Sequence, residues 1–253
     1  AAGASPFTQF RTHRTPTRIR RRPGVSDDWD DIAEWWVAAT GDGAADSDEM
    51  LDVVRALVDP AGGRTLDLGC GDGQALPLLG EHAIGVDLSH QLLVAAARQA
   101  PVVRCQLPDL SWVRPGSIDQ AVAVGLLDLI ADDRKFFEQV ATAVRTDGAL
   151  VVVMNHPVVT APDSEPLVDD AGQVSWRWGC YLERGVLVQP AGHRTVELHH
   201  RPLGELLTTA AAAGWCLERL IEGGATTHTI STSAGEHGQE HLPSLLGARW
   251  RRR

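Results

Sequence analysis

The sequence predicts an α/β fold built on a doubly wound, mostly parallel β-sheet with an antiparallel edge strand, N-terminal helices and an inserted β cap. From Arg64 onward, short apolar runs alternate with helical stretches, which is typical of a parallel sheet wound with helices. The run at 149–154 is apolar throughout, as expected for a strand covered on both faces. With 253 residues, 43% of them apolar, the chain is long enough for one large domain or one domain that carries an insertion.

Two helices are expected before the sheet begins. In the segment 28–39, Ile32 and Trp36 lie one helical turn apart. The segment 47–58 starts at a serine and ends before Pro60, which cannot continue a helix.

The sheet is expected to take its first five strands from apolar segments and its helices from the segments between them. The strands, in chain order, are predicted at 65–68, 83–86, 102–103, 118–124 and 149–154. The helices are predicted at 74–79, 91–99 and 133–144.

This alternation breaks after Asn155. A polar loop is expected over 160–173 and antiparallel strands over 174–198, with turns near 183–185 and 190–192. We therefore interpret 156–202 as a substrate cap inserted into the core.

The core is expected to resume with a helix at 203–213, a strand at 215–221 and a last strand at 243–250. Because no helix separates the last two strands, we expect them to form an antiparallel pair at one sheet edge. The chain thus divides into a basic arm at 1–26, a core with N-terminal helices at 27–155, the cap at 156–202 and the rest of the core at 203–253.

Charge is distributed unevenly along the chain. Six arginines lie in the first 25 residues and four in the last five, which leaves 13 of the 23 basic residues against 33 acidic ones between them. Such an acidic body repels phosphate backbones, so a nucleic-acid substrate is not expected. The basic arm is interpreted as a solvated tail, with contact to an anionic partner as the alternative.

Cysteine spacing and apolar run length exclude other classes of protein. The four cysteines lie far apart with no metal-ligand spacing, so no metal is expected, and reduced thiols in the cytoplasm are the expectation. No apolar run approaches the roughly 20 residues needed to cross a bilayer, and the N-terminal stretch lacks a secretory signal.

The segment 65–73, Thr-Leu-Asp-Leu-Gly-Cys-Gly-Asp-Gly, predicts a buried strand that runs into a glycine-rich turn. Glycines let a ligand approach the main chain closely, and Asp87 follows Asp67 by twenty residues, at the end of the second predicted strand. A carboxylate there can accept hydrogen bonds from ribose hydroxyls. The pattern predicts a nucleoside pocket at the carboxyl edge of the sheet.

The spacing of Asp67, Gly69, Gly71 and Gly73 resembles the D-x-G-x-G-x-G motif of class I S-adenosylmethionine-dependent methyltransferases, which have a Rossmann-like fold. A dinucleotide fingerprint would place its third glycine at Gln74. Further matches to the family lie at 29–36, 85–89, 117–119 and 146–150, and segments at 156–157 and 199–203 resemble a bacterial small-molecule subgroup that includes ubiquinone-biosynthesis-like methyltransferases. The resemblance spans 27–250.

The resemblance implies S-adenosylmethionine as the cofactor. The residues expected to bind it are Trp36, Asp67, Gly69, Cys70, Gly71, Gly73, Asp87, Leu88, Asp109, Leu110 and Gly125. Asp67 could instead only hold the loop amides, and Cys70 could contribute only its backbone. The family often has an acidic residue after the third strand; Cys105, Gln106 and Leu107 stand there, with Asp109 the nearest acid.

On the acceptor side, His156 and His200 are the candidate general bases, because one follows the fifth strand and the other leaves the cap. Four residues are expected to bind the substrate, namely Asp128, Trp176, Trp178 and Arg201. A capping or surface role for Asp128, a surface ion pair for Arg201 and packing of the cap for the two tryptophans remain as alternatives.

The function expected from these features is methyl transfer to an O, N or C atom of a small organic molecule, giving S-adenosylhomocysteine. Three alternatives stay open. They are a different reaction on the same fold, a non-catalytic ligand-binding protein, and a nicotinamide-dependent oxidoreductase, which Gln74 disfavours.

Overall fold

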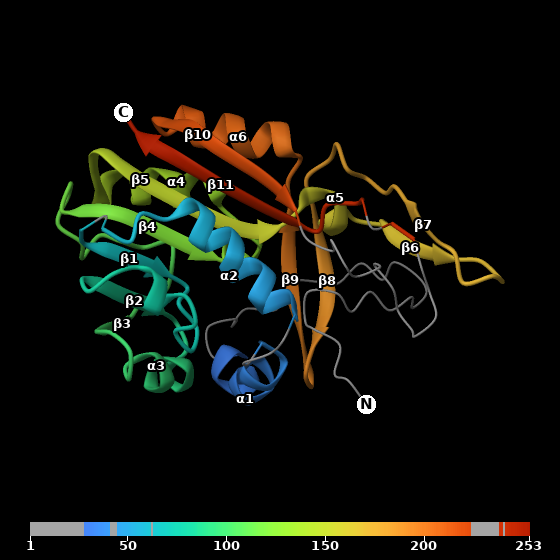
Figure 1. Ribbon diagram of the computed structural model, residues 1–253, viewed down its shortest axis with the longest axis horizontal. Helices are drawn as coiled ribbons and strands as arrows, with labels where there is room; N and C mark the ends of the chain where they lie inside the picture. Colours follow the sequence, from blue (N-terminus) through green and yellow to red (C-terminus); the bar gives the residue numbers. More distant parts are fainter. Residues whose placement is uncertain (1–27, 41–44, 62, 224–237, 240) are drawn as a thin grey trace.

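The computed structural model describes residues 28–40, 45–61, 63–223, 238–239 and 241–253. The basic arm at 1–26 lies outside these residues. A seven-stranded sheet forms the centre of the described part, with the strand order β10-β11-β5-β4-β1-β2-β3 (Figure 1). Its strands are β1 Thr65–Leu68, β2 Ala83–Asp87, β3 Val102–Arg104, β4 Ile118–Val124, β5 Val144–Asn155, β10 Trp215–Gly223 and β11 Leu245–Arg252.

The sheet is parallel except at β11. This strand runs antiparallel to both of its neighbours, β5 and β10. The expected antiparallel pair at one sheet edge is therefore present, and the reversed strand is the inner member of the pair.

Helices cover both faces of the sheet. On one face α4 Asp133–Ala143 and α6 Leu203–Ala212 pack in a core with Phe136, Phe137 and Trp250. On the other face α2 Ala45–Leu57 and α3 His90–Ala96 pack in a second core. The remaining N-terminal helix, α1 Asp28–Thr40, contacts α3.

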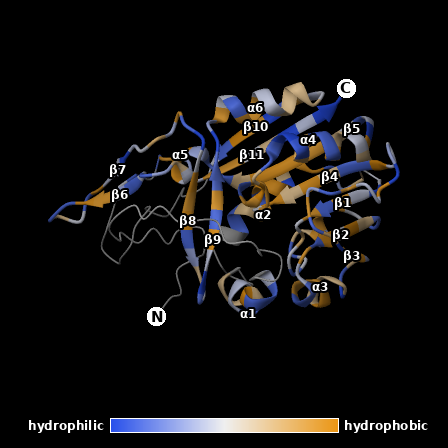
Figure 2. Ribbon diagram, turned by 180° about the vertical axis from the view of Figure 1, so that it is seen from behind, coloured by the Kyte–Doolittle hydropathy of each residue, from blue (hydrophilic) through white to orange (hydrophobic). Residues whose placement is uncertain are grey.

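The apolar run in β5 explains why both faces are covered. Leu150, Val152 and Met154 belong to one core, and Val151 and Val153 to the other, because successive side chains of a strand point to opposite faces. The strands in the middle of the sheet are largely coloured as hydrophobic, whereas the helices carry both hydrophilic and hydrophobic residues (Figure 2).

Two sequence expectations differ from the structure. The helix expected at 74–79 is only a single 3₁₀ turn, η1 Leu76–Leu78, since Pro77 lacks an N–H and Gly80 follows with a φ of 87°. The polar loop expected at 160–173 contains strand β6 Glu165–Val168, which pairs with β7 Val174–Arg177.

The segment interpreted as a cap forms the short helix α5 Pro157–Thr160 and two separate two-stranded sheets. The hairpin β8 Gly185–Ala191 and β9 Arg194–His200 lies across the carboxyl ends of the core strands and beside α1, whereas β6 and β7 project away from the core (Figure 1). Among the described residues, no helix is both long and apolar enough to span a membrane.

Candidate active site

The turn after β1 is built by glycines with left-handed backbone conformation. Gly69 and Gly71 have φ angles of 71° and 55°, which residues with a Cβ rarely adopt. A Cβ at Gly69 would lie 2.8 Å from the Leu126 side chain, whereas the nearest atom to a Cβ at Gly71 is Trp36 Nε1 at 3.6 Å. The open approach to the main chain is therefore at Gly71.

Asp87 joins this turn to the end of β2. Its Oδ2 accepts a hydrogen bond from the Gly71 N–H at 2.9 Å, and its Oδ1 accepts one from the Ser89 N–H at 2.8 Å. Burial raises the pKa of the Asp87 carboxyl, and the two amides partly offset that effect. The Asp87 carboxylate therefore lies beside the glycine turn, where the Gly71 and Ser89 amides hold it in place.

Asp67 lies deeper and is only 1% exposed. Neither of its carboxylate oxygens has a hydrogen-bond partner among the described residues. Burial, together with the nearby charge of Asp87, raises the pKa of Asp67 to about 7. Because a buried carboxylate without a partner is costly, this side chain is suited to a ligand that brings a positive charge or N–H donors.

Both carboxylates line one cleft at the carboxyl edge of the sheet. The part that contains Asp87 has about 880 Å³ of open space, and the part that contains Asp67 has about 500 Å³. The two parts share Trp36, Gly69, Gly71, Val124 and Gly125 in their walls. Helix α1 forms one side of the cleft through Trp29 and Trp36.

Most residues expected to bind the cofactor meet in this cleft. Those that line it are Trp36, Asp67, Gly69, Cys70, Gly71, Asp87, Leu88 and Gly125. Burial raises the pKa of the Cys70 thiol, so it is uncharged. The wall after β3 is supplied by Cys105, Gln106 and Leu107.

Three of the expected cofactor residues do not line the cleft. Gly73 packs against Ala96 with no room for a side chain, so it shapes the turn. Asp109 is exposed and accepts a hydrogen bond from the Ser111 N–H at 3.0 Å. Leu110 is buried in the core. Asp109 and Leu110 point away from the cleft because the chain turns after β3.

His156, expected as a base, caps helix α5 instead. Its Nδ1 accepts a hydrogen bond from the Val158 N–H at 3.1 Å, so the ring proton is on Nε2, which donates to Glu222 Oε1 at 2.9 Å. Burial lowers the pKa of His156, against the opposing effect of Glu222. With both ring nitrogens engaged and no place in the cleft wall, His156 does not have the geometry of a base there.

His200 is likewise held within the protein. It is 1% exposed, its Nε2 donates to the Tyr181 carbonyl at 2.8 Å, and its Nδ1 lies 3.1 Å from Thr160 Oγ1. Burial lowers the pKa of this imidazole. His200 therefore fastens β9 to the rest of the cap, and like His156 it does not line the cleft.

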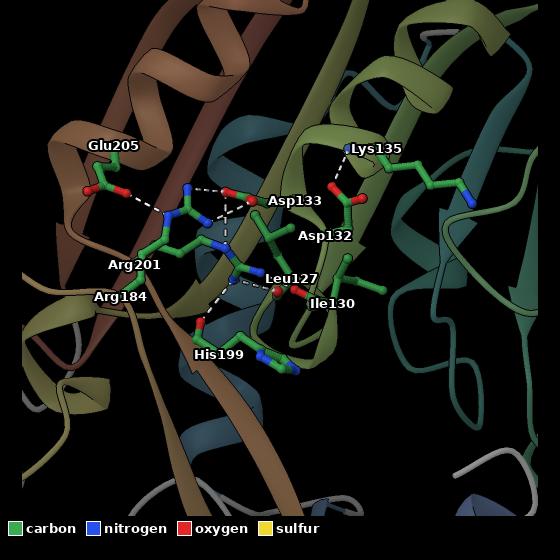
Figure 3. A network of polar contacts seen from close by, with 9 residues as sticks. All are labelled: Leu127, Ile130, Asp132, Asp133, Lys135, Arg184, His199, Arg201 and Glu205. Carbon is green, nitrogen blue, oxygen red and sulfur yellow. Dashed lines mark hydrogen bonds and ion pairs between the residues drawn. The ribbon is translucent and has the colours of Figure 1, made fainter. Parts of the chain in front are cut away.

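Arg201 is buried under the loop that follows β4 and does not line the cleft. Its guanidinium donates to the carbonyls of Leu127 and Ile130, and its Nε lies 3.1 Å from Asp133 Oδ2 (Figure 3). Asp133 also binds Arg184 through two contacts of 3.0 and 3.1 Å. The expected substrate contact, and the alternative of a surface ion pair, are replaced by a buried network.

Asp128 does not line the cleft either, but it binds Asn155, which lines a further pocket beside the cleft. Its Oδ2 accepts hydrogen bonds from the Asn155 backbone N–H at 3.1 Å and from Asn155 Nδ2 at 2.8 Å. Burial raises the pKa of Asp128 to about 6, with Asn155 and Arg201 opposing. Asn155 belongs to no sequence motif, so its contact with Asp128 could be found only from the structure.

The two cap tryptophans do not form a common wall. Trp176 is buried against Val158 and Val159, which is the packing alternative. Strand β7 ends at Arg177, so Trp178 lies beyond the strand that carries Trp176, and it is 62% exposed. Trp35 of α1, which carries no sequence motif, lines a further pocket beside the cleft.

Comparison with known proteins identifies the domain. Residues 66–152 match the family model described as a methyltransferase domain. A ubiquinone biosynthesis O-methyltransferase of Xanthomonas campestris is 29% identical over 110 residues, which cover 40% of this chain and 46% of that protein. A phosphatidylethanolamine N-methyltransferase of Cereibacter sphaeroides is 29% identical over 128 residues, covering 44% of this chain and 58% of that protein. The chain thus spans about half the length of the curated relatives it matches.

The fold similarity extends further than the sequence similarity. The crystal structure of an S-adenosylmethionine-dependent methyltransferase from Mesorhizobium loti superposes with a TM-score of 0.66 and 25% identity, over 83% of this chain and 99% of that one. The match over residues 66–152 shows that this part of the chain is a methyltransferase domain, and the structural similarity shows that the chain has the fold of S-adenosylmethionine-dependent methyltransferases.

Proposed function

We propose that this chain transfers a methyl group from S-adenosylmethionine to a small organic acceptor and releases S-adenosylhomocysteine. The observation that carries the proposal is the buried, unpartnered carboxylate of Asp67 in the wall of a cleft that also holds Asp87. The cofactor has an ammonium and a sulfonium charge that suit the first carboxylate, and ribose hydroxyls that suit the second.

The cleft residues fit the parts of such a cofactor. Asp87 would accept hydrogen bonds from the ribose, and the apolar walls at Leu88 and Leu107 would pack on the purine. Asp67 would lie toward the amino-acid part, in the portion of the cleft that also holds Asp72. When bound, S-adenosylmethionine supplies an electrophilic methyl group.

The protein's own contribution to catalysis would be placement. Trp29 and Trp36 on α1 line the cleft and would shield a bound cofactor from water. Since His156 and His200 lie outside the cleft, we propose that rate enhancement comes mainly from holding the acceptor in line with the methyl group, which can supply several kcal/mol, about 7 to 11 in well-oriented cases.

We further propose a cytoplasmic enzyme that acts on a small molecule and does not bind nucleic acid. The four cysteines are free thiols, in keeping with a reducing compartment. The acidic body between the arginine-rich ends supports the exclusion of nucleic acid.

Calorimetric titration tests the cofactor site. We expect S-adenosylhomocysteine to bind the wild-type protein and NADH not to bind. Asp87→Ala should weaken binding by roughly 2 to 4 kcal/mol through lost charged hydrogen bonds, and Gly71→Val should abolish it. Asp109→Ala, a matched loss of a carboxylate outside the cleft, should bind normally.

Absence of binding by the wild-type protein, or unchanged affinity in Asp87→Ala, would refute the proposed site. Mass analysis of the product separates methyl transfer, which adds one methyl group to the acceptor, from another reaction on the same fold. Cofactor binding without turnover of any acceptor would favour a non-catalytic ligand-binding protein.

A further inference from the structure

A separate pocket opens beside the cofactor cleft, between α1 and the β8–β9 hairpin. It has about 340 Å³ of open space and shares Trp29, Trp36, Gly125 and Leu129 with the cleft. It is completed by Trp35, Asn155, Gln189, Ala191, Val196 and Leu198. A molecule in this pocket would therefore lie next to whatever fills the cleft.

The chemistry of the wall favours a flat, uncharged occupant. Three indole rings and four aliphatic side chains line the pocket, and its polar side chains are the amides of Asn155 and Gln189. Among the residues that the structure describes, none of the side chains that line the pocket carries a formal charge. A charged occupant would lose its hydration without gaining an opposite charge, which is costly.

The orientation of Asn155 is fixed by Asp128. An ionised carboxylate can only accept hydrogen bonds, and its Oδ2 already receives the Asn155 backbone N–H, so the side-chain Nδ2 must face it. This leaves Asn155 Oδ1 on the opposite edge of the planar amide group, away from Asp128. It accepts no hydrogen bond from the residues the structure describes, while Asn155 lines the pocket.

The backbone at Asn155 is also held, because this residue ends β5 and pairs with Leu245 of β11. Arg201 lies close enough to favour the charged form of Asp128. The buried network around Arg201 thus helps to hold Asp128, which in turn orients the Asn155 side chain. The Asn155 amide oxygen is therefore a fixed acceptor in an apolar wall.

We propose that this pocket binds the methyl acceptor as a flat, neutral molecule, and that Asn155 Oδ1 selects it by accepting a hydrogen bond from its hydroxyl or amine. The inference rests on the proposed function, because the occupant of the neighbouring cleft is taken to be the cofactor. Asn155 would position the group that is methylated.

Binding of three matched probes to the protein saturated with S-adenosylhomocysteine tests the proposal. The probes are 2-naphthol, which has one O–H donor, 2-methoxynaphthalene, which has the same rings without the donor, and 2-naphthoate, which is charged. We expect 2-naphthol to bind roughly fivefold to tenfold more tightly than its methyl ether, the size of one neutral hydrogen bond, and more tightly than the carboxylate.

Asn155→Leu should remove the preference for 2-naphthol and leave the affinity for S-adenosylhomocysteine unchanged. Asp128→Asn keeps the volume but offers Asn155 both a donor and an acceptor, so the amide can turn and the preference should fall. Val196→Trp should fill the pocket and block both neutral probes. The Asp128 variant keeps the test decisive even where Asn155→Leu does not fold.

Equal binding of 2-naphthol and its methyl ether by the wild-type protein, or binding of neither, would overturn the inference. So would preference for 2-naphthoate, or a preference for 2-naphthol that survives in both the Asn155 and Asp128 variants. Failure of S-adenosylhomocysteine to bind would instead refute the proposed function, so the two failures are distinguishable.

Discussion

Asp67 shows how a single residue can be arranged for a ligand at a cost to the folded protein. Its pKa in the folded state, about 7, lies above the ordinary value of 3.8. The folded protein therefore holds this proton more tightly than the unfolded chain does. The protonated group stabilises the folded state at low pH, and this contribution is lost as pH rises from 3.8 toward 7. For a shift of three pKa units the loss in the free energy of unfolding is about 4 kcal/mol.

We predict that Asp67→Asn raises the unfolding midpoint of the ligand-free protein at pH 8, where the wild-type carboxylate is charged. The gain should shrink as pH falls from 7 to 4, since the wild-type group becomes neutral. Thermal unfolding of both proteins across this pH range measures the difference between their midpoints. A difference between the two proteins that does not depend on pH would contradict this account of Asp67.

The same residue predicts how cofactor binding depends on pH. A cationic ligand favours the charged carboxylate, so binding at pH 6.5 should release protons and affinity should rise between pH 5 and 8. Calorimetry in two buffers of different ionisation enthalpy measures the protons released. Asp67→Asn should bind more weakly and release fewer protons; equal release in both proteins would assign the titration to another group.

At the scale of elements, the β8–β9 hairpin, the start of α6 and the loop after β4 are joined by Arg201. This side chain is 1% exposed and binds two loop carbonyls, whereas Arg184, which contacts the same Asp133, is 45% exposed. A buried charge that loses its partner is far more costly than an exposed one. The two arginines should therefore differ greatly in their effect on stability.

We predict that Arg201→Met lowers the free energy of unfolding by about 3 to 5 kcal/mol, and that Arg184→Met lowers it by about 1 kcal/mol or less. Urea unfolding compares the midpoints at a constant slope. Similar midpoints for the two variants would mean that the buried network does not hold the hairpin in place.

The sequence was sufficient for elements whose signal is local. Alternating segments located the strands from β1 to β5, and the motif located Asp67 and Asp87 because glycine spacing and strand order together determine the turn. Sequence patterns were not sufficient where the direction of a side chain depends on tertiary packing. His156 and His200 follow strands as active-site residues do, yet local capping and the turn into α6 direct them inward.

Asn155 shows the converse. It has no motif around it, and its importance comes from a partner 27 positions away in the chain, Asp128. Only the neighbouring ends of β4 and β5 bring these two residues together. A pattern of single residues could therefore predict the residues of the glycine turn and its cleft, and not the pocket that we propose for the acceptor.

At the scale of the whole molecule, the site is assembled from distant segments. Helix α1 and the β8–β9 hairpin face each other across the pocket and are linked by Arg194 Nη2 and Asp31 Oδ2 at 2.5 Å. Both side chains are about half exposed, 46% and 48%, so this ion pair contributes little. Contacts to a ligand in the pocket should therefore add to the order of the two segments.

We predict that S-adenosylhomocysteine slows amide hydrogen exchange in α1, and that adding an acceptor probe slows it further in the β8–β9 hairpin. Helix α6, on the far side of the sheet from α2 and α3, serves as the internal reference and should be unchanged. Protection that appears in β6 and β7 instead would place the acceptor elsewhere.

The position of β11 has a consequence for how the protein forms on the ribosome. This strand follows all the others in the sequence, yet it lies between β5 and β10, which cannot pair in this sheet without it. During synthesis β5 therefore presents an open edge until residues 245–252 have left the exit tunnel. An exposed apolar edge is a site where nascent chains aggregate. The ion pairs of Arg249 and Arg251 in β11 with Glu218 in β10 form only in the finished sheet, after the period of greatest risk.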